Sequence, residues 1–128
     1  MRLLLDTHIL LWALTDDSRL PSSVRELLLD AHNDVYFSAA TIWEIAIKRS
    51  LRRSDMPVSA AEALRLFRES GYEELGISSA HAARVEEMPM IHTDPFDRLL
   101  VAQALTEPMR LITRDKAVAA YSPGIMLV

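Results

Sequence analysis

The sequence predicts an α/β fold in which helices cover a parallel sheet. Short apolar or β-branched runs of strand length alternate along the chain with longer segments in which apolar residues recur at helical spacing. Strands joined by helical crossovers of this kind run parallel in one sheet. The chain has 128 residues and no long Pro- or Gly-rich linker, so we expect a single domain over residues 1–128.

The N-terminal half is expected to form two strands and four helices. An apolar strand spans residues 2–5, and a β-branched and aromatic strand spans residues 35–37. Helices are expected where apolar residues recur every three or four positions after a polar residue or a proline that suits a helix start. Gly71 suits the end of the last of them. These helices run from about 7 to 13, 22 to 31, 39 to 49 and 60 to 70.

The C-terminal half is expected to form three strands and three helices. One helix starts with Asp94 at the N-cap and Pro95 at the first helical position, where a missing N–H costs nothing. It ends near residue 106, before Pro108. Another helix follows Ser78 or Ser79, and a short one spans 116–121. The strands are expected at 74–77, 110–113 and 125–128.

The composition excludes several classes of protein. The absence of cysteine excludes a disulfide scaffold, a thiolate metal site and a cysteine nucleophile. A net charge of −4 argues against a simple electrostatic nucleic-acid binder, but not against an enzyme whose acids hold a divalent ion. The N-terminal apolar run is too short for a signal peptide, and no stretch approaches the roughly 20 apolar residues of a membrane helix. We therefore expect a cytoplasmic protein without a membrane association.

Four acids are expected to meet at one edge of the sheet. Asp6 and Asp115 follow strands closely. Glu44 lies near the start of the helix after the second strand, and Asp97 lies at the start of the helix that leads to the fourth. The carboxyl ends of parallel strands share one edge, where ligands bind. Carboxylates so close repel one another, and a hard divalent ion such as Mg²⁺ or Mn²⁺ would remove that repulsion.

Each acid also has a purely structural interpretation, which the sequence leaves open. Asp6 and Asp115 suit helix N-caps, and Glu44 is spaced for an i,i+4 ion pair with Lys48. Asp97 suits the third position of a well-capped helix. Because Mg²⁺ usually takes only one or two carboxylates directly, we expect Asp6 and Asp97 to bind the ion. Glu44 and Asp115 would act through water or a second ion.

Four segments together match the pattern of a known family. They are Leu5–Trp12, Ser38 with Trp43–Lys48, His92–Ala104, and Leu111–Asp115, which occur in family order and span nearly the whole chain. On these segments the chain resembles the PIN-domain ribonucleases, specifically the VapC-type toxins of type II toxin–antitoxin modules. Thr93 stands where a basic residue is common, and Ala39–Ala40 replace a Pro-containing turn, but neither departure touches an acid.

The resemblance implies a three-layer α/β/α PIN-like fold with a parallel, five-stranded central sheet. It implies a Mg²⁺- or Mn²⁺-dependent endoribonuclease toxin in which metal-activated water cuts RNA and leaves 5′-phosphate and 3′-hydroxyl ends. It also implies a homodimer and a VapB-like antitoxin that covers the site and alone contacts operator DNA. The alternative is a catalytically inactive PIN-fold module that acts only within a protein complex. The resemblance assigns the metal site to Asp6, Glu44, Asp97 and Asp115.

Residues near the acids are candidates for supporting roles. Thr7, Ser38 and Thr113 could hold a metal water or a carboxylate, or could simply cap strand ends. Arg98 could contact phosphate, although pairing with a nearby acid is the simpler expectation, and His92 is interpreted as a structural hydrogen-bonding residue. Basic residues near this edge could contact RNA phosphates. They are Lys48, Arg49, Arg52, Arg53, Arg114 and Lys116.

Two further observations bear on partners and rivals. Trp12 and the pair Leu10–Leu11 supply more apolar surface than one short helix buries, so part of it could line a groove for an amphipathic antitoxin helix. A receiver domain would need two acids at the end of the first strand, where only Asp6 stands. A phosphatase with an aspartate nucleophile would need an acid two residues after Asp6, where His8 stands.

Overall fold

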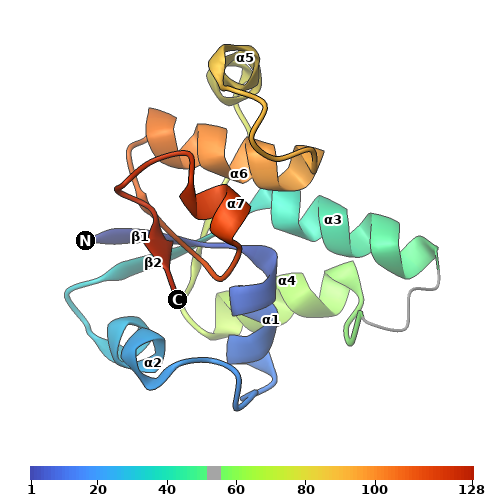
Figure 1. Ribbon diagram of the computed structural model, residues 1–128. Coiled ribbons are helices and arrows are strands. Elements are labelled where there is room, and N and C mark those ends of the chain that lie inside the picture. Colours follow the sequence, from blue (N-terminus) through green and yellow to red (C-terminus); the bar gives the residue numbers. More distant parts are fainter. Residues whose placement is uncertain (52–55) are drawn as a thin grey trace.

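A computed structural model describes residues 1–51 and 56–128 (Figure 1). Its five strands form one sheet in the order β3-β2-β1-β4-β5, and every neighbouring pair is parallel. The predicted α/β class and the parallel sheet are therefore confirmed. The strands are β1 (Arg2–Leu5), β2 (Asp34–Ser38), β3 (Glu73–Leu75), β4 (Arg110–Thr113) and β5 (Met126–Leu127).

The helices of the described residues cover both faces of the sheet, which gives three layers. Leu3 and Leu5 of β1 pack in one core with side chains of α1, α2 and α4, whereas Leu4 packs in a second core with α6 and α7. Figure 1 shows α5, α6 and α7 on the opposite side of the sheet from α1, α2 and α4. The helices are α1 (Thr7–Leu14), α2 (Ser22–Leu29), α3 (Ala39–Ser50), α4 (Ala60–Glu69), α5 (Ser79–Glu87), α6 (Pro95–Thr106) and α7 (Lys116–Ala119).

The sheet order places β1 where the chain changes direction across the sheet. From β1 the chain builds outward through β2 to β3, and later returns to the other side of β1 with β4 and then β5. In open parallel sheets, ligands bind beyond the carboxyl ends of the strands at such a switch point. Asp6 directly follows β1 and Asp115 lies two residues after β4, so both acids flank that point.

The helix caps that the sequence predicts are present. The Asp94 carboxylate accepts hydrogen bonds from the backbone N–H groups of Phe96 and Asp97, and Pro95 occupies the first turn of α6. Asp6 and Asp115 likewise cap α1 and α7. The structural interpretation of these two acids therefore holds, and their carboxylates also lie at the edge of the sheet where a ligand would bind.

A few element bounds differ from the prediction. The third strand is Glu73–Leu75 rather than 74–77, because Ser78 caps α5 and residues 76–77 are needed to connect the two elements. The backbone turns extended at Asp30, so α2 ends at Leu29 rather than at 31. The last helix stops at 119 and the last strand covers only Met126–Leu127. Within the described residues, no helix combines the length and the hydropathy needed to cross a membrane.

Candidate metal centre

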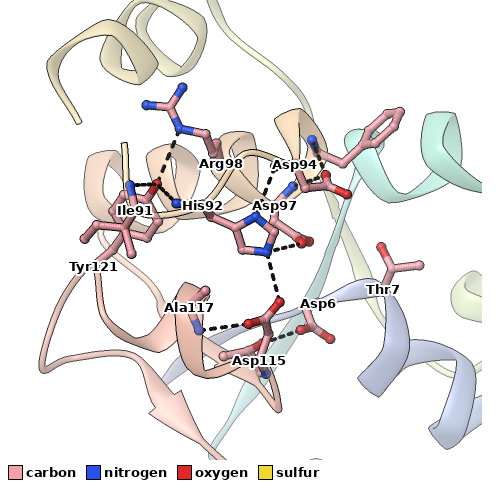
Figure 2. Close-up of polar contacts among 12 residues, drawn as sticks. Asp6, Thr7, Ile91, His92, Asp94, Asp97, Arg98, Asp115, Ala117 and Tyr121 are labelled. Atoms are coloured by element: carbon pink, nitrogen blue, oxygen red, sulfur yellow. Dashed lines mark hydrogen bonds and ion pairs between the residues drawn. The ribbon is translucent and has the colours of Figure 1, made fainter. Parts of the chain in front are cut away.

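The predicted acids gather at the carboxyl edge of the sheet. Figure 2 shows the side chains of Asp6, Asp97 and Asp115 pointing toward one common region beside His92. Ligand atoms of His92, Asp97 and Asp115 all lie within 4.8 Å of one another. Asp6 and Glu44 both repel the charge of Asp97, so they belong to the same cluster. The structure thus brings together acids from distant parts of the sequence. The two most distant, Asp6 and Asp115, are 109 positions apart.

Asp6 is buried and held from two sides. The whole residue is only 4% exposed. Oδ1 accepts a hydrogen bond from the Ile9 backbone N–H at 3.1 Å, and Oδ2 accepts one from the Thr113 hydroxyl. Burial raises the pKa of the Asp6 carboxyl, although the bonds from Thr113 and Ile9 oppose this shift. Thr113 therefore orients an acid, as one of its two predicted roles requires.

Asp97 carries the clearest electrostatic signature of the site. Burial, together with repulsion from Asp94, Asp6 and Glu44, raises the pKa of Asp97 from 3.8 to about 7. Its Oδ2 lies 3.2 Å from His92 Nε2, and no hydrogen-bond donor among residues 1–51 and 56–128 reaches Oδ1. The carboxylate thus has an oxygen available where negative charge is crowded, which favours binding of a cation.

Glu44 lies deeper and has both of its oxygens engaged. The residue is 3% exposed. Oε1 accepts a hydrogen bond from the Thr7 hydroxyl at 2.6 Å, and Oε2 lies 2.6 Å from Lys48 Nζ. The hydroxyl of Thr7 also lies 3.1 Å from that of Thr41, a contact that the sequence did not reveal. The predicted i,i+4 pair with Lys48 is therefore real, and it neutralises a buried charge.

Asp115 is the most exposed of the acids. Its side chain is 40% exposed, and Oδ1 accepts a hydrogen bond from the Ala117 backbone N–H at 2.8 Å. Partial burial raises the pKa of Asp115, but the hydrogen bonds from His92 and Ala117 outweigh it and hold the pKa below its usual value. The two acids therefore differ strongly in pKa: Asp115 ionises readily, whereas Asp97 tends to keep its proton.

His92 belongs to the same cluster, although its contacts with the acids were not predicted from the sequence. Its Nδ1 accepts the Asp94 backbone N–H at 3.0 Å, and its Nε2 hydrogen-bonds Asp115 Oδ2 at 2.9 Å (Figure 2). The interpretation of His92 as a structural hydrogen-bonding residue fits these contacts. A histidine two residues before a helix N-cap was a visible signal, but its acidic partners come from later parts of the chain.

Comparison with known proteins identifies the family of this chain. The family model for the PIN domain matches residues 3–122, which is most of the chain. The chain belongs to the PIN-domain family. A relative named ribonuclease VapC22, from Mycobacterium tuberculosis (strain ATCC 25618 / H37Rv), is 28% identical over 120 residues, covering 92% of this chain and 90% of that protein.

Solved PIN-like structures share the fold along the whole chain. VapBC2 from Rickettsia felis, crystallised with a DNA fragment from its promoter, matches with a TM-score of 0.71 at 17% identity, covering 100% of this chain and 98% of that chain. DNA-bound VapBC from Salmonella typhimurium matches with a TM-score of 0.66 at 18% identity, covering 100% and 97%. At these identities the likeness supports the three-layer PIN-like fold.

Two predicted supporting residues have partners other than the acids. Ser38 caps α3 and donates to Gln103 Oε1 at 2.5 Å, so this buried pair ties the end of β2 to α6 of the PIN fold. Arg98 does not pair with an acid in the described part of the chain, contrary to the simpler expectation. Its guanidinium donates to the backbone carbonyls of Val85 and Met88, because α5 ends directly against this face of α6.

The candidate RNA contacts differ in how available they are. Arg114 and Lys116 are exposed beside Asp115, and the Arg114 guanidinium lies 5.0 Å from the ring centre of Trp12. Lys48 is committed to Glu44, and Arg49 donates to a backbone carbonyl, that of Met56. The remaining two candidates, Arg52 and Arg53, lie outside the described residues.

A cavity of about 460 Å³ opens beside α1 of the PIN domain, and none of the four predicted acids lines it. Trp12 and Leu11 form part of its wall and are themselves only 6% and 8% exposed. Thr7 and Lys48, which both contact Glu44, line the same cavity. Trp12 and Leu11 therefore belong to the core and also border a hollow near the site, so the two roles considered for them are compatible.

Proposed function

We propose that this PIN-domain protein, with residues 1–128 acting as one domain, is a Mg²⁺- or Mn²⁺-dependent endoribonuclease. We further propose that it is the toxin of a VapBC-type toxin–antitoxin system. The observation that carries the proposal is the cluster of Asp97 and Asp115 at the switch point of a PIN fold, close enough to Asp6 and Glu44 for these charges to raise the pKa of Asp97. The name of the similar ribonuclease VapC22 supports RNA as the substrate.

The donor atoms suit a hard divalent ion. Carboxylate oxygens are the ligands that Mg²⁺ and Mn²⁺ prefer, and the raised pKa of Asp97 reflects negative charge that a cation would neutralise. We propose that Asp97 and Asp6 bind the ion directly. The Lys48 ammonium already balances the charge of Glu44, and Asp115 is the most exposed of the four acids, which supports a role for these two through water or a second ion.

The chain's own residues would prepare the site for hydrolysis of a phosphodiester bond. The Asp94 cap fixes the first turn of α6 and so fixes Asp97. The Thr113 hydroxyl holds Asp6, and the exposed Arg114 would contact a backbone phosphate of RNA. When bound, the divalent ion would supply the charge that activates water and stabilises the phosphate in the transition state. The products would carry 5′-phosphate and 3′-hydroxyl ends.

We also propose a VapB-like antitoxin partner, a homodimer and a cytoplasmic location, with operator DNA contacted only through the antitoxin. The solved VapBC complexes among the structural neighbours support the antitoxin. The side chains of Trp43, Ile47 and Leu51 recur every four residues along and just beyond α3, and they are 55%, 38% and 67% exposed. An exposed apolar stripe of this kind is typical of a surface that a protein partner covers.

RNA cleavage tests the proposal. We expect purified protein to cut RNA with Mg²⁺ or Mn²⁺, and to lose this activity in EDTA or when Asp6→Asn removes one acid. Asp34→Asn is the matched control, because Asp34 is exposed at the amino end of β2, away from the cluster. Activity that persists in EDTA and in Asp6→Asn would contradict the metal mechanism. A protein that neither binds metal nor cuts RNA would instead be the inactive module that acts within a complex.

A further inference from the structure

We propose that His92 is a positioning residue of the metal site, which holds Asp115 and Asp97 in the arrangement that receives the ion, and that it is not itself a ligand. The inference rests on the proposed metal site and deepens it. Three observations carry it: the direction in which each ring nitrogen bonds, the anchoring of the His92 backbone, and the way in which the two acids are brought together.

The hydrogen bonds fix which nitrogen of the ring carries the proton. Nδ1 accepts the Asp94 backbone N–H at 3.0 Å, so in the neutral ring Nδ1 has no proton and the hydrogen is on Nε2. Nε2 hydrogen-bonds Asp115 Oδ2 at 2.9 Å and lies 3.2 Å from Asp97 Oδ2. Nε2 is therefore a donor that faces two carboxylates. It offers no lone pair to a metal ion in this arrangement.

The backbone of His92 is held as firmly as its ring. The Tyr121 hydroxyl accepts hydrogen bonds from the N–H groups of both Ile91 and His92, at 3.2 and 2.9 Å. Arg98, whose guanidinium also binds the end of α5, donates to the same hydroxyl at 3.4 Å. Figure 2 shows Tyr121 on one side of the loop and the acids on the other, with the imidazole reaching between them. Hydrogen bonds thus fix both the backbone and the imidazole ring of His92.

This position has a direct consequence for the two acids. Asp97 belongs to α6 and Asp115 caps α7, and they would repel one another if nothing stood between them. The Nε2–H of His92 hydrogen-bonds Asp115 Oδ2, and the same nitrogen lies 3.2 Å from Asp97 Oδ2, so this polar group between the two carboxylates offsets their repulsion. This arrangement leaves Asp97 Oδ1 without a donor in the described part of the chain. Outer residues that orient metal ligands in this way typically change metal affinity or activity about 10–100-fold when mutated.

The competing possibility is that His92 is a third ligand, since its nitrogen lies within 4.8 Å of the ligand atoms of Asp97 and Asp115. Nitrogen-15 NMR of histidine-labelled protein, titrated with Mg²⁺, separates the two roles. If His92 is a positioning residue, its ring keeps the Nε2–H tautomer at saturating Mg²⁺. Loss of the Nε2 proton with a metal-induced shift of that nitrogen would show a ligand and would overturn the inference.

Calorimetric titration with Mn²⁺ measures the effect on affinity. We expect His92→Ala to weaken Mn²⁺ binding about 10–100-fold, and His92→Gln, which keeps an N–H donor, to recover part of that loss. In an Asp115→Asn background, the loss of Mn²⁺ affinity caused by His92→Ala should be smaller, because the imidazole acts through that acid. The matched control is His32→Ala, since the side chain of His32 is 96% exposed. We expect this variant to bind Mn²⁺ like the wild type.

The outcomes separate this inference from the proposed function. If His92→Ala binds Mn²⁺ as tightly as the wild type, the positioning role is wrong. If His92→Ala does not fold by circular dichroism, His92→Gln and Tyr121→Phe, which removes the anchor of the loop, test the same role and should both weaken Mn²⁺ binding. If the wild type binds Mn²⁺ but cuts no RNA, the ribonuclease proposal fails while the inference stands. If the wild type binds no Mn²⁺, both are overturned.

Discussion

Replacing Asp97 by asparagine should make the metal-free protein more stable at alkaline pH. Asp97 has a pKa of about 7 because it is buried near Asp94, Asp6 and Glu44, so ionising it in the folded state is costly. The asparagine side chain has nearly the same shape as aspartate and carries no charge. The crowded carboxylates of a cation site destabilise the folded protein when no cation is bound. The substitution removes one of these charges and therefore that loss of stability.

The magnitude follows from the pKa. A rise from 3.8 to about 7 corresponds to at most about 4 kcal/mol, at 1.36 kcal/mol per pKa unit. The Asp97 side chain is 23% exposed, so solvent screening reduces this value, and we expect about 2 kcal/mol. For a domain of this size that corresponds to a rise in Tm of roughly 6–10 °C.

The sign is set by proton binding. Because the pKa of Asp97 is higher in the folded than in the unfolded state, the folded protein binds more protons between about pH 4 and 7. The wild type therefore gains stability from this group as the pH falls through that window. The uncharged amide of the Asp97→Asn variant has no such dependence. The advantage of the variant should be full above pH 8 and should be lost by about pH 4.

Thermal unfolding in EDTA at a series of pH values measures this difference, with Asp34→Asn as the exposed control. Saturating Mg²⁺ should raise the Tm of the wild type and should have much less effect on Asp97→Asn, because a ligand stabilises only the state that binds it. If Asp97→Asn is no more stable than the wild type at pH 8, or if its advantage does not change with pH, the crowding of charge described for this site is wrong.

Three more substitutions test neighbouring contacts. Lys48→Met leaves the buried Glu44 carboxylate without its cation and should destabilise the protein by about 2–3 kcal/mol in urea unfolding at pH 7, whereas Lys116→Met should have little effect. Thr113→Val removes a donor to buried Asp6 and should cost about 1–3 kcal/mol by the same measurement; an unchanged midpoint would contradict that contact. In an Asp6→Asn background, Arg114→Ala should weaken RNA binding regardless of RNA sequence. It should also reduce the salt dependence of RNA binding by about one charge. An unchanged salt dependence would rule out a phosphate contact.

The sequence was sufficient to predict features that are determined locally or by topology. The cap by Asp94 and Pro95 needs only neighbouring backbone groups, so its pattern was readable. The gathering of Asp6 and Asp115 followed from one rule, that parallel strands end at a common edge. The same rule could not give the strand order or the bounds of the short edge strands, since these depend on how much room each connection leaves.

Contacts between distant side chains were out of reach. Ser38 looked like a residue beside the acids, yet its hydroxyl is occupied by Gln103, which is 65 positions away. Arg98 was expected to pair with an acid, but the end of α5 offers backbone carbonyls at that place. The role of His92 depends on its hydrogen bond with Asp115, which follows β4 in the chain. Such pairings depend on tertiary packing, which periodicity and spacing do not encode.

We propose that these carboxylates together form a divalent metal site. Anomalous diffraction from crystals grown with Mn²⁺ tests it most directly, because the signal locates the ion without reference to activity. We predict one or two peaks bounded by Asp6, Asp97 and Asp115, with the direct ligands supplied by Asp6 and Asp97. If Mn²⁺ binds elsewhere and the space between these acids stays free of anomalous density, the acids do not form the metal site.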